Sequence, residues 1–291
     1  MKIEIISKKF RGNLVLRDIS LNLERGSIIG LVGKNGAGKT TLMKIICGNI
    51  VHYEGEIESS SNESNIGFLI EHPKFYPNST GLYNLNYFSE VSMKKIDKKY
   101  IEYIISSLGM NDYINRKVKT YSLGMKQRLG IAISLLKKPQ YLILDEPTNG
   151  MDPEGSLEVL NIIKKLGKQF NMSILISSHK LEDIEMISDK IIYIENGIIK
   201  RNIDTKQLVQ SGIVEILLST NEVQTVYSLI KNEVKIISVE EQSIKIEYID
   251  DYSFILEKLA KHNIFPKSIE KHTRTLKDFY FNLSEKRREI K

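Results

Sequence analysis

A glycine-rich segment between residues 33 and 40 has the residue types and spacing of a phosphate site. It follows the pattern G-x-x-x-x-G-K-[ST], directly after the apolar run 28–32 and before a stretch of helix formers. Glycines let the backbone turn closely, so successive N–H groups point at phosphate oxygens, and the following helix adds its N-terminal dipole. The lysine would reach the β- and γ-phosphates, and the threonine hydroxyl would ligate Mg²⁺. The predicted phosphate-binding residues are Gly33, Lys34, Asn35, Gly36, Ala37, Gly38, Lys39, Thr40 and Thr41.

A second candidate element carries two acidic residues. Residues 141–147 read YLILDEP, an apolar run that ends in Asp145 and Glu146. In open α/β sheets, ligands bind at the carboxyl ends of the strands. We therefore expect Asp145 to hold Mg²⁺ together with Thr40, and Glu146 to be the general base for an attacking water. A strand that merely ends in a solvated acidic turn is the alternative, and the phosphate loop in the same chain favours the catalytic interpretation.

Further motifs lie around these two. Residues 120–133 read TYSLGMKQRLGIAI, Gly150-Met151-Asp152 follow Glu146, and residues 173–180 read SILISSHK. Near the start, Phe10 lies six residues before Leu16. Taken in order, these motifs resemble those of the ATP-binding-cassette (ABC) ATPases over residues 10–179, and the resemblance continues to about residue 212.

The resemblance implies roles for the additional motifs. Residues 122–125 would be the signature, which contacts the ATP bound by a partner subunit, so that two chains face head to tail around two ATPs. Asp152 would belong to the D-loop, His179 would contact the γ-phosphate, and Phe10 would stack on adenine. The signature departs from the family pattern by Tyr121 for Leu, Leu123 for Gly and Met125 for Gln, whereas Ser122 and Gly124 are retained. Ser122 could also be an ordinary helix N-cap, and Phe10 an ordinary core residue.

Glu71 ends the run IGFLIE and is followed by His72 and Pro73. The resemblance places it where the family has a glutamine that contacts Mg²⁺ and the attacking water. A carboxylate ligates Mg²⁺ at least as well as an amide oxygen, so Glu71 is a further candidate metal ligand and catalytic residue. We expect it to lie close to Asp145 and Glu146, or else to be an exposed glutamate that opens a loop. The segment IEHPKFYPN most resembles ATPase subunits of bacitracin and lantibiotic self-protection exporters.

The predicted architecture is an α/β core of the P-loop NTPase (RecA-like) class. Parallel strands are expected near 28–32, 66–70, 141–145, 173–177 and 191–195, with an antiparallel flank within residues 1–25 and a helical subdomain inserted at about 72–135. This ATPase domain would span residues 1–212. Residues 213–291 would form an α+β accessory domain with the order β-α-β-β-α-β, which suggests a ferredoxin-like module. A last helix over 276–283 and a basic tail at 286–288 would follow.

Composition limits the location of the chain. The 291 residues are 41% hydrophobic and 27% charged, which is typical of a soluble globular protein. The longest apolar runs are strand-sized, the N-terminus has no signal-peptide pattern, and Cys47 is the single cysteine. We expect a cytoplasmic protein, peripheral at the inner face of the cell membrane. The net charge of +6 does not by itself indicate nucleic-acid binding, and no nucleic-acid partner is expected.

The leading hypothesis is an ATPase motor subunit with ATP and Mg²⁺ as cofactors. Its partners would be a second ATPase subunit, identical or paralogous, and separate transmembrane permease subunits, with export of a peptide antibiotic as the activity. The main alternative is an ABC-type ATPase outside transport, in DNA repair or translation, but the sequence has neither a long heptad run nor a second phosphate loop. A GTPase switch would need a guanine-reading [NT]-K-x-D motif, and Thr205-Lys206-Gln207-Leu208 lacks the aspartate.

Overall fold

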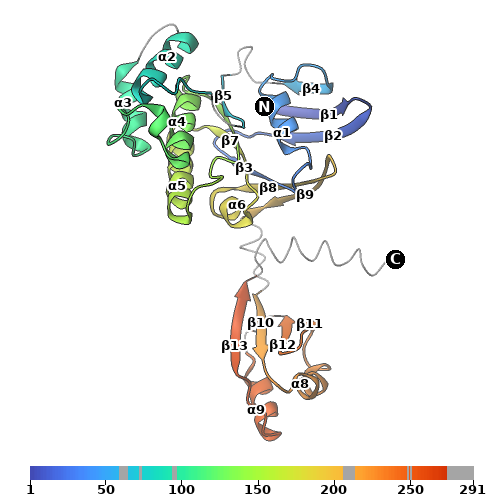
Figure 1. The fold of residues 1–291 in the computed structure, drawn as a ribbon. Coiled ribbons are helices and arrows are strands. Elements are labelled where there is room, and N and C mark those ends of the chain that lie inside the picture. The colour runs from blue at the N-terminus through green and yellow to red at the C-terminus, as the bar shows by residue number, and fades with distance from the viewer. Residues whose placement is uncertain are drawn as a thin grey trace. The chain divides into compact units, whose positions relative to one another are not determined.

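The computed structural model describes residues 1–58, 65–71, 74–93, 97–205, 214–247, 249 and 251–273. The chain forms two compact units, residues 1–206 and residues 207–291 (Figure 1). The domain boundary predicted at residue 212 lies outside the described residues. So do His72, Pro73, the predicted helix 276–283 and the basic tail.

The first unit is built on a six-stranded sheet with the order β5-β6-β7-β3-β8-β9. The five strands from β5 to β8 are parallel and β9 is an antiparallel edge. Strands β3 and β7 are buried along their whole length, as expected for parallel strands covered on both faces. The parallel strands predicted from the sequence are therefore confirmed. Their bounds are β3 Ile28–Val32, β5 Ile66–Leu69, β6 Tyr141–Asp145, β7 Ser173–Ser177, β8 Lys190–Glu195 and β9 Ile198–Asp204.

The antiparallel flank is a three-stranded sheet with the order β2-β1-β4. Its strands are β1 Lys2–Phe10, β2 Asn13–Asn22 and β4 Glu54–Glu58. Helix α1 (Lys39–Ile46) shares one hydrophobic core with this sheet and with the parallel sheet. Because α1 begins at the end of the phosphate loop, this core fixes the loop against both sheets.

A helical subdomain lies between β5 and β6 along the chain. It contains α2 (Gly81–Met93), α3 (Lys98–Ser107), a short 3-10 helix (Val118–Thr120) and α4 (Leu123–Leu135). In Figure 1 these helices gather on the side of the parallel sheet opposite the antiparallel flank. Helix α4 begins directly after Ser122, whose side chain caps it by accepting a hydrogen bond from the Met125 N–H.

Two further helices follow the acidic strand end. Helix α5 (Pro153–Gln169) is capped by Asp152, whose side chain accepts a hydrogen bond from the Gly155 N–H. Helix α6 (Leu181–Ile187) follows β7. None of the helices in the described part of the chain is both long enough and apolar enough to span a bilayer.

The second unit has the element order β-α-β-β-α-β. It consists of β10 Val214–Ser219, α8 Val223–Ile230, β11 Ile236–Val239, β12 Ser243–Glu247, α9 Ser253–Lys261 and β13 Ser268–Thr273. The sheet has the order β11-β12-β10-β13, and all neighbouring strands are antiparallel. Its own core of buried residues lies between Ile216 and Ile264.

Candidate nucleotide site

The phosphate loop connects β3 to α1 and forms the wall of an open pocket. Residues 35–41, Val15 of β2 and Glu146 line this pocket, whose volume is about 340 Å³. Gly38, the N-cap of α1, has a left-handed backbone (φ 105°), and a Cβ there would lie 2.6 Å from Leu16 Cδ2. Only glycine therefore lets the loop enter the helix at this point. The pocket has the N-terminus of α1 at its base, where the helix dipole favours an anion.

Lys39 is buried and already folded onto the loop. Its ammonium donates hydrogen bonds to the carbonyl oxygens of Gly33 (2.6 Å) and Lys34 (3.3 Å). Burial lowers the pKa of this ammonium, while the negative charges of Glu146 and Asp145 act in the opposite direction. An ammonium has three donors, so the two carbonyl bonds leave one for a phosphate oxygen.

Asp145 lies at the C-terminal end of β6 and joins two hydroxyl groups. Thr40 Oγ1 donates to Asp145 Oδ2 (2.6 Å), and Ser177 Oγ donates to Asp145 Oδ1 (2.5 Å). The Thr40 hydroxyl and the Asp145 carboxylate thus present hard oxygen donors side by side at the phosphate loop. This donor set fits Mg²⁺, which commonly takes one or two protein oxygens together with nucleotide phosphates and water.

Glu146 follows directly and has a left-handed backbone (φ 48°), which is uncommon for a residue with a side chain. Its N–H donates to Ser177 Oγ at 3.0 Å and points toward the Ser177 carbonyl at 3.2 Å. The Glu146 carboxylate lies 3.2 Å from His179 Nδ1, from the segment that follows β7. The structure therefore brings together Glu146 and His179, two residues selected from separate motifs. A base held by an imidazole beside a phosphate pocket can activate water.

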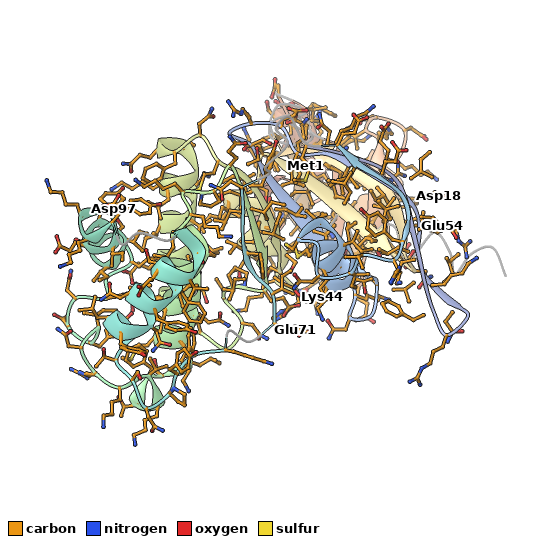
Figure 2. All side chains as sticks on the ribbon, turned by 90° about the horizontal axis from the view of Figure 1, so that it is seen from above. Met1, Asp18, Lys44, Glu54, Glu71 and Asp97 are labelled. Carbon is orange, nitrogen blue, oxygen red and sulfur yellow. The ribbon has the colours of Figure 1, made fainter. Side chains whose placement is uncertain are left out.

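Glu71 follows β5, the strand next to β6, and it also has a left-handed backbone (φ 58°). Its carboxylate forms an ion pair with Lys44 of α1 at 2.5 Å, and Figure 2 shows the two labelled residues next to each other. Among the described residues, no three His, Cys, Asp or Glu side chains group together so as to hold a metal ion. The Glu71 side chain is instead 61% exposed and paired with Lys44, and its role as a ligand of Mg²⁺ stays a prediction.

Phe10 ends β1 at the tip of the β1–β2 hairpin, opposite Asn13. Phe10 is 43% exposed, and the Lys8 ammonium lies over its ring, 4.8 Å from the ring centre. Phe10 is not among the residues that line the phosphate pocket, but Val15 of the same hairpin is. The hairpin therefore reaches the pocket through β2.

Gly197, in the turn between β8 and β9, ties this hairpin to the phosphate loop. Its N–H donates to the Ala37 carbonyl (3.1 Å), and its carbonyl accepts from the Arg17 N–H of β2 (2.8 Å). The backbone is left-handed (φ 73°), and a Cβ there would lie 2.1 Å from the Val15 oxygen. A side chain at this position would push the hairpin away from the loop.

The signature and D-loop residues contact each other at the starts of α4 and α5. Ser122 and Leu123 are exposed, and a Cβ at Gly150 would lie 2.3 Å from Leu123 Cδ2. A Cβ at Gly124 would lie 3.3 Å from the Met151 side chain. The motifs selected from the sequence thus form one exposed surface, with Asp152 capping α5 beside it.

Tyr121, which replaces the family leucine before the signature serine, is buried within the helical subdomain. Its hydroxyl donates to the Tyr113 carbonyl (2.9 Å), and the two rings meet edge to face at 5.1 Å. A Cβ at Gly81, the first residue of α2, would lie 2.2 Å from the Tyr121 hydroxyl oxygen. The larger residue at 121 is therefore accommodated by glycine at 81.

Sequence reasoning missed four contacting residues of this site: Ser177, Lys44, Gly197 and Lys8. Ser177 faces Asp145 because β6 and β7 pair in that register, and the register is a property of the folded sheet. The signal that could have indicated this contact is the position of Ser177, directly after the apolar run of a predicted strand. Lys44 lies one helical turn beyond Thr40, a spacing that places both on one face of α1.

Comparisons with known proteins agree with this geometry. Residues 16–149 match the family model described as ABC transporter. The chain is similar to the uncharacterized ABC transporter ATP-binding protein YcbN of Bacillus subtilis, with 33% identity over 96% of this chain and 94% of YcbN. It is 38% identical to the lantibiotic transport ATP-binding protein SrtF of Streptococcus pyogenes, over 68% of this chain and 87% of SrtF. It is 35% identical to the bacitracin transport ATP-binding protein BcrA of Enterococcus faecalis, over 70% of this chain and 69% of BcrA.

A solved structure has the same fold. The ATP-binding cassette MJ0796, a dimer in a post-hydrolysis state bound to ADP and Pi, aligns with a TM-score of 0.62 at 21% identity, covering 70% of this chain and 98% of that chain. The first unit therefore has the ABC-type P-loop fold with its antiparallel β subdomain. The chain belongs to the family of ABC transporter ATP-binding proteins, and it is an ABC-type ATPase.

Proposed function

We propose that this chain is the motor subunit of an exporter that protects its host from a peptide antibiotic of the lantibiotic or bacitracin kind. The observation that carries the proposal is the meeting of Lys39, Asp145 and Glu146 at one edge of the parallel sheet, beside the phosphate pocket. The relatives SrtF and BcrA, named for lantibiotic and bacitracin transport, support the substrate class.

In the proposed reaction, residues 33–41 hold the nucleotide phosphates and Lys39 neutralises the β- and γ-phosphates. Thr40 and Asp145 would hold Mg²⁺, with Glu71 as a further ligand once it leaves Lys44. When bound, the metal supplies positive charge that stabilises the negative charge developing on the phosphoryl oxygens. Phe10 would stack on the adenine.

Glu146 would take the proton of the attacking water. The contact with His179 Nδ1 holds one carboxylate oxygen, Oε2, and leaves Oε1 for the water. His179 is about half exposed, and we assign its imidazole to the γ-phosphate. The hydrogen bond from Thr40 to Asp145 keeps the hydroxyl beside the same strand end.

The exposed signature supports head-to-tail pairing with a second ATPase subunit, identical or paralogous. The Ser122 hydroxyl accepts the Met125 N–H and keeps its own O–H as a donor. Gly124 adds a close backbone approach, and the N-terminus of α4 favours an anion. We assign residues 122–125 to the γ-phosphate of the partner subunit's ATP and Asp152 to the same interface.

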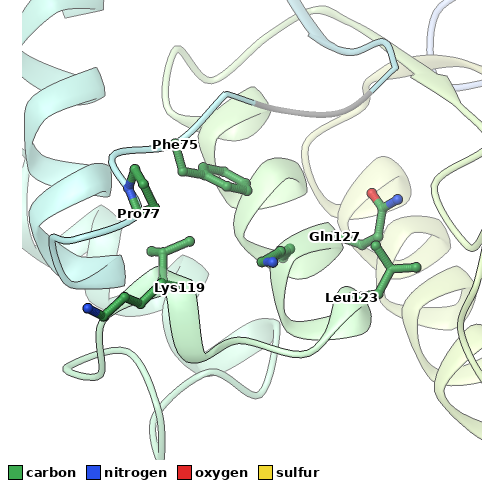
Figure 3. Close-up of a pocket in the computed structure, with 7 residues that line it drawn as sticks. Phe75, Pro77, Lys119, Leu123 and Gln127 are labelled. Atoms are coloured by element: carbon green, nitrogen blue, oxygen red, sulfur yellow. The ribbon is translucent and has the colours of Figure 1, made fainter.

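We assign the docking of the membrane subunit to a pocket on the helical subdomain with a volume of about 320 Å³. Phe75 and Pro77, which follow Glu71, face Leu123 and Gln127 of α4 across it (Figure 3). Gln127 is buried, and its side-chain oxygen is a hydrogen-bond acceptor without a partner in the described structure.

The same pocket is bordered by Lys119 and Lys126. Its chemistry suits a short cytoplasmic helix of the permease that carries an apolar residue, an N–H donor and a nearby carboxylate. Binding there would place the chain at the inner face of the cell membrane. It would also join the membrane subunit to the signature, because Leu123 lines the pocket, and Phe75 in the pocket wall lies four residues after Glu71 along the chain.

The second unit belongs, in our assignment, to the ferredoxin-like class. Its element order and its sheet order β11-β12-β10-β13, with every pair antiparallel, support this assignment. We do not assign this accessory module a role in ATP hydrolysis.

The proposal is tested with Glu146→Gln. A lost general base lowers turnover by about 10²–10⁴-fold. The variant should bind ATP, hydrolyse it slowly and form a dimer with ATP and Mg²⁺ in size exclusion at high protein concentration. Turnover close to that of the wild type would contradict the role of Glu146.

The transport function needs a separate test. The chain is expressed with its membrane subunit, isolated from detergent-solubilised membranes, and the host is challenged with bacitracin and with a lantibiotic. We expect co-purification and resistance that Lys39→Ala abolishes. A chain that stays free of membrane proteins would favour the alternative, an ABC-type ATPase in DNA repair or translation.

A further inference from the structure

Lys8 and Phe10 stand two residues apart on β1, so their side chains leave the same face of the strand. The Lys8 ammonium lies over the Phe10 ring at 4.8 Å from its centre and also donates a hydrogen bond to the His52 carbonyl. One face of the ring is therefore covered by a cation that is itself held by the backbone. Phe10 as a residue is still 43% exposed, so Lys8 does not bury it and it remains open to a ligand.

Strand β2 of the hairpin contacts the phosphate loop through Leu16, and its neighbour Val15 lines the phosphate pocket. Lys8 pairs with Leu16 of β2, whose side chain is fully buried and would meet a Cβ at Gly38. The hairpin is held at this distance from the loop by the two hydrogen bonds of Gly197. Phe10 thus belongs to an element whose position relative to the phosphate pocket is fixed.

We propose that Lys8 is a positioning residue for the nucleotide base: it holds the Phe10 ring from one face so that the other face is presented to the purine. This inference rests on the proposed stacking of Phe10 on adenine. An exposed aromatic ring at a strand end would otherwise lose rotational freedom when it binds a base. The Lys8 ammonium on one face restricts the ring before binding and so removes part of this entropy loss. It also withdraws electron density from the ring, and the ring then stacks on an electron-rich purine.

The expected size follows from the contact. The contact is already present in the free protein, so it changes affinity through the ordering of the ring that it spares. Fixing one flexible side chain costs about 0.5–1.5 kcal/mol, and sparing about 0.5–1 kcal/mol of it corresponds to about a two- to five-fold change in dissociation constant. The effect should depend on the base, because the phosphates are bound by a separate loop. It should also be kept when arginine replaces lysine, since a guanidinium forms a cation–π contact as an ammonium does.

The experiment is isothermal titration of the full chain with ADP and, as a base-free probe, with inorganic pyrophosphate. Lys8→Ala should weaken ADP binding about two- to five-fold and leave pyrophosphate binding unchanged. Lys8→Arg should bind both ligands like the wild type. Lys9→Ala is the matched control, because it removes the same charge from the neighbouring exposed position and should change neither ligand.

Phe10→Ala separates the two levels of the inference. If Phe10→Ala weakens ADP binding and Lys8→Ala does not, stacking stands and the role of Lys8 is overturned. If Phe10→Ala leaves ADP binding unchanged, the stacking itself fails. Equal loss of ADP and pyrophosphate affinity in Lys8→Ala, or a full additional loss when Lys8→Ala is added to Phe10→Ala, would show that Lys8 acts by general charge and not through the ring.

Discussion

The packing of Gly81 against Tyr121 leads to a stability prediction that the structure makes quantitative. A Cβ at Gly81 would lie 2.2 Å from the Tyr121 hydroxyl, 2.9 Å from Ile114 Cδ1 and 3.1 Å from the Ile114 carbonyl. Overpacking of this kind costs about 1–3 kcal/mol, and alanine in a helix returns at most about 1 kcal/mol relative to glycine. Gly81→Ala should therefore lower the free energy of unfolding by about 1–2 kcal/mol, despite its higher helix propensity.

The assay is thermal unfolding of Gly81→Ala, Tyr121→Phe and the double variant. For a unit of this size, 1 kcal/mol corresponds to about 2–4 °C, so Gly81→Ala should unfold about 2–8 °C lower. Tyr121→Phe loses the hydrogen bond to the Tyr113 carbonyl, which contributes about 1 kcal/mol, but it also removes the atom nearest to the new methyl group. In the Phe background, Gly81→Ala should be less destabilising by about 1 kcal/mol.

Tyr113→Phe is the matched control, because it makes the same chemical change on the neighbouring ring. The Tyr113 hydroxyl has no hydrogen-bond partner in the described structure, and it is not among the atoms nearest to a Cβ at Gly81. It should not rescue Gly81→Ala. If Gly81→Ala is equally destabilising in the wild type and in Tyr121→Phe, the hydroxyl contact is not the source of strain and the reasoning is refuted.

Two functional predictions concern charges at the site. Lys39→Ala should weaken ATP binding by about 10- to 150-fold in a titration, since a hydrogen bond to a charged group contributes about 1.5–3 kcal/mol, and unchanged affinity would contradict the phosphate-loop assignment. Glu71→Gln should keep basal ATP turnover within about tenfold of the wild type. Glu71→Ala should lose more of the ATP turnover stimulated by the membrane subunit than of its ATP affinity. If this stimulated turnover is equal in Glu71→Ala and the wild type, Glu71 is an ordinary surface residue. Lys44→Ala should change unfolding stability by no more than about 1 kcal/mol, because the ion pair is partly exposed, and a larger loss in urea unfolding would contradict that interpretation.

The elements that carry contiguous patterns could be predicted from the sequence. The apolar run before Gly33, the glycine spacing and Lys39 are local features, so the strand, the loop and α1 follow from short-range rules. The same holds for β6, whose apolar residues end at Asp145. The strand order could not be derived in this way, because it depends on which strands pair across the sheet.

The contacts between segments that are distant along the chain could not be predicted from the sequence. Glu71 was expected near the other carboxylates because the family resemblance places a Mg²⁺-contacting residue there, yet its side chain pairs with Lys44 of α1. Nothing local to Glu71 indicates that partner. The substitution of tyrosine for leucine at residue 121 was visible, but its partner Gly81 lies forty residues away along the chain and became evident only from packing.

The two hydrogen bonds of Gly197 have a consequence for the entropy of nucleotide binding. Ala37 of the phosphate loop and Arg17 of β2 are bonded to opposite sides of one peptide segment. The loop that we assign to the phosphates and the hairpin that carries Phe10 are therefore ordered relative to each other before any ligand arrives. A ligand that contacts two independently moving segments must order both, at a cost of about 0.5–1.5 kcal/mol for each flexible side chain that it fixes. Here a large part of that ordering is already contained in the folding of the chain, so more of the interaction free energy remains as affinity.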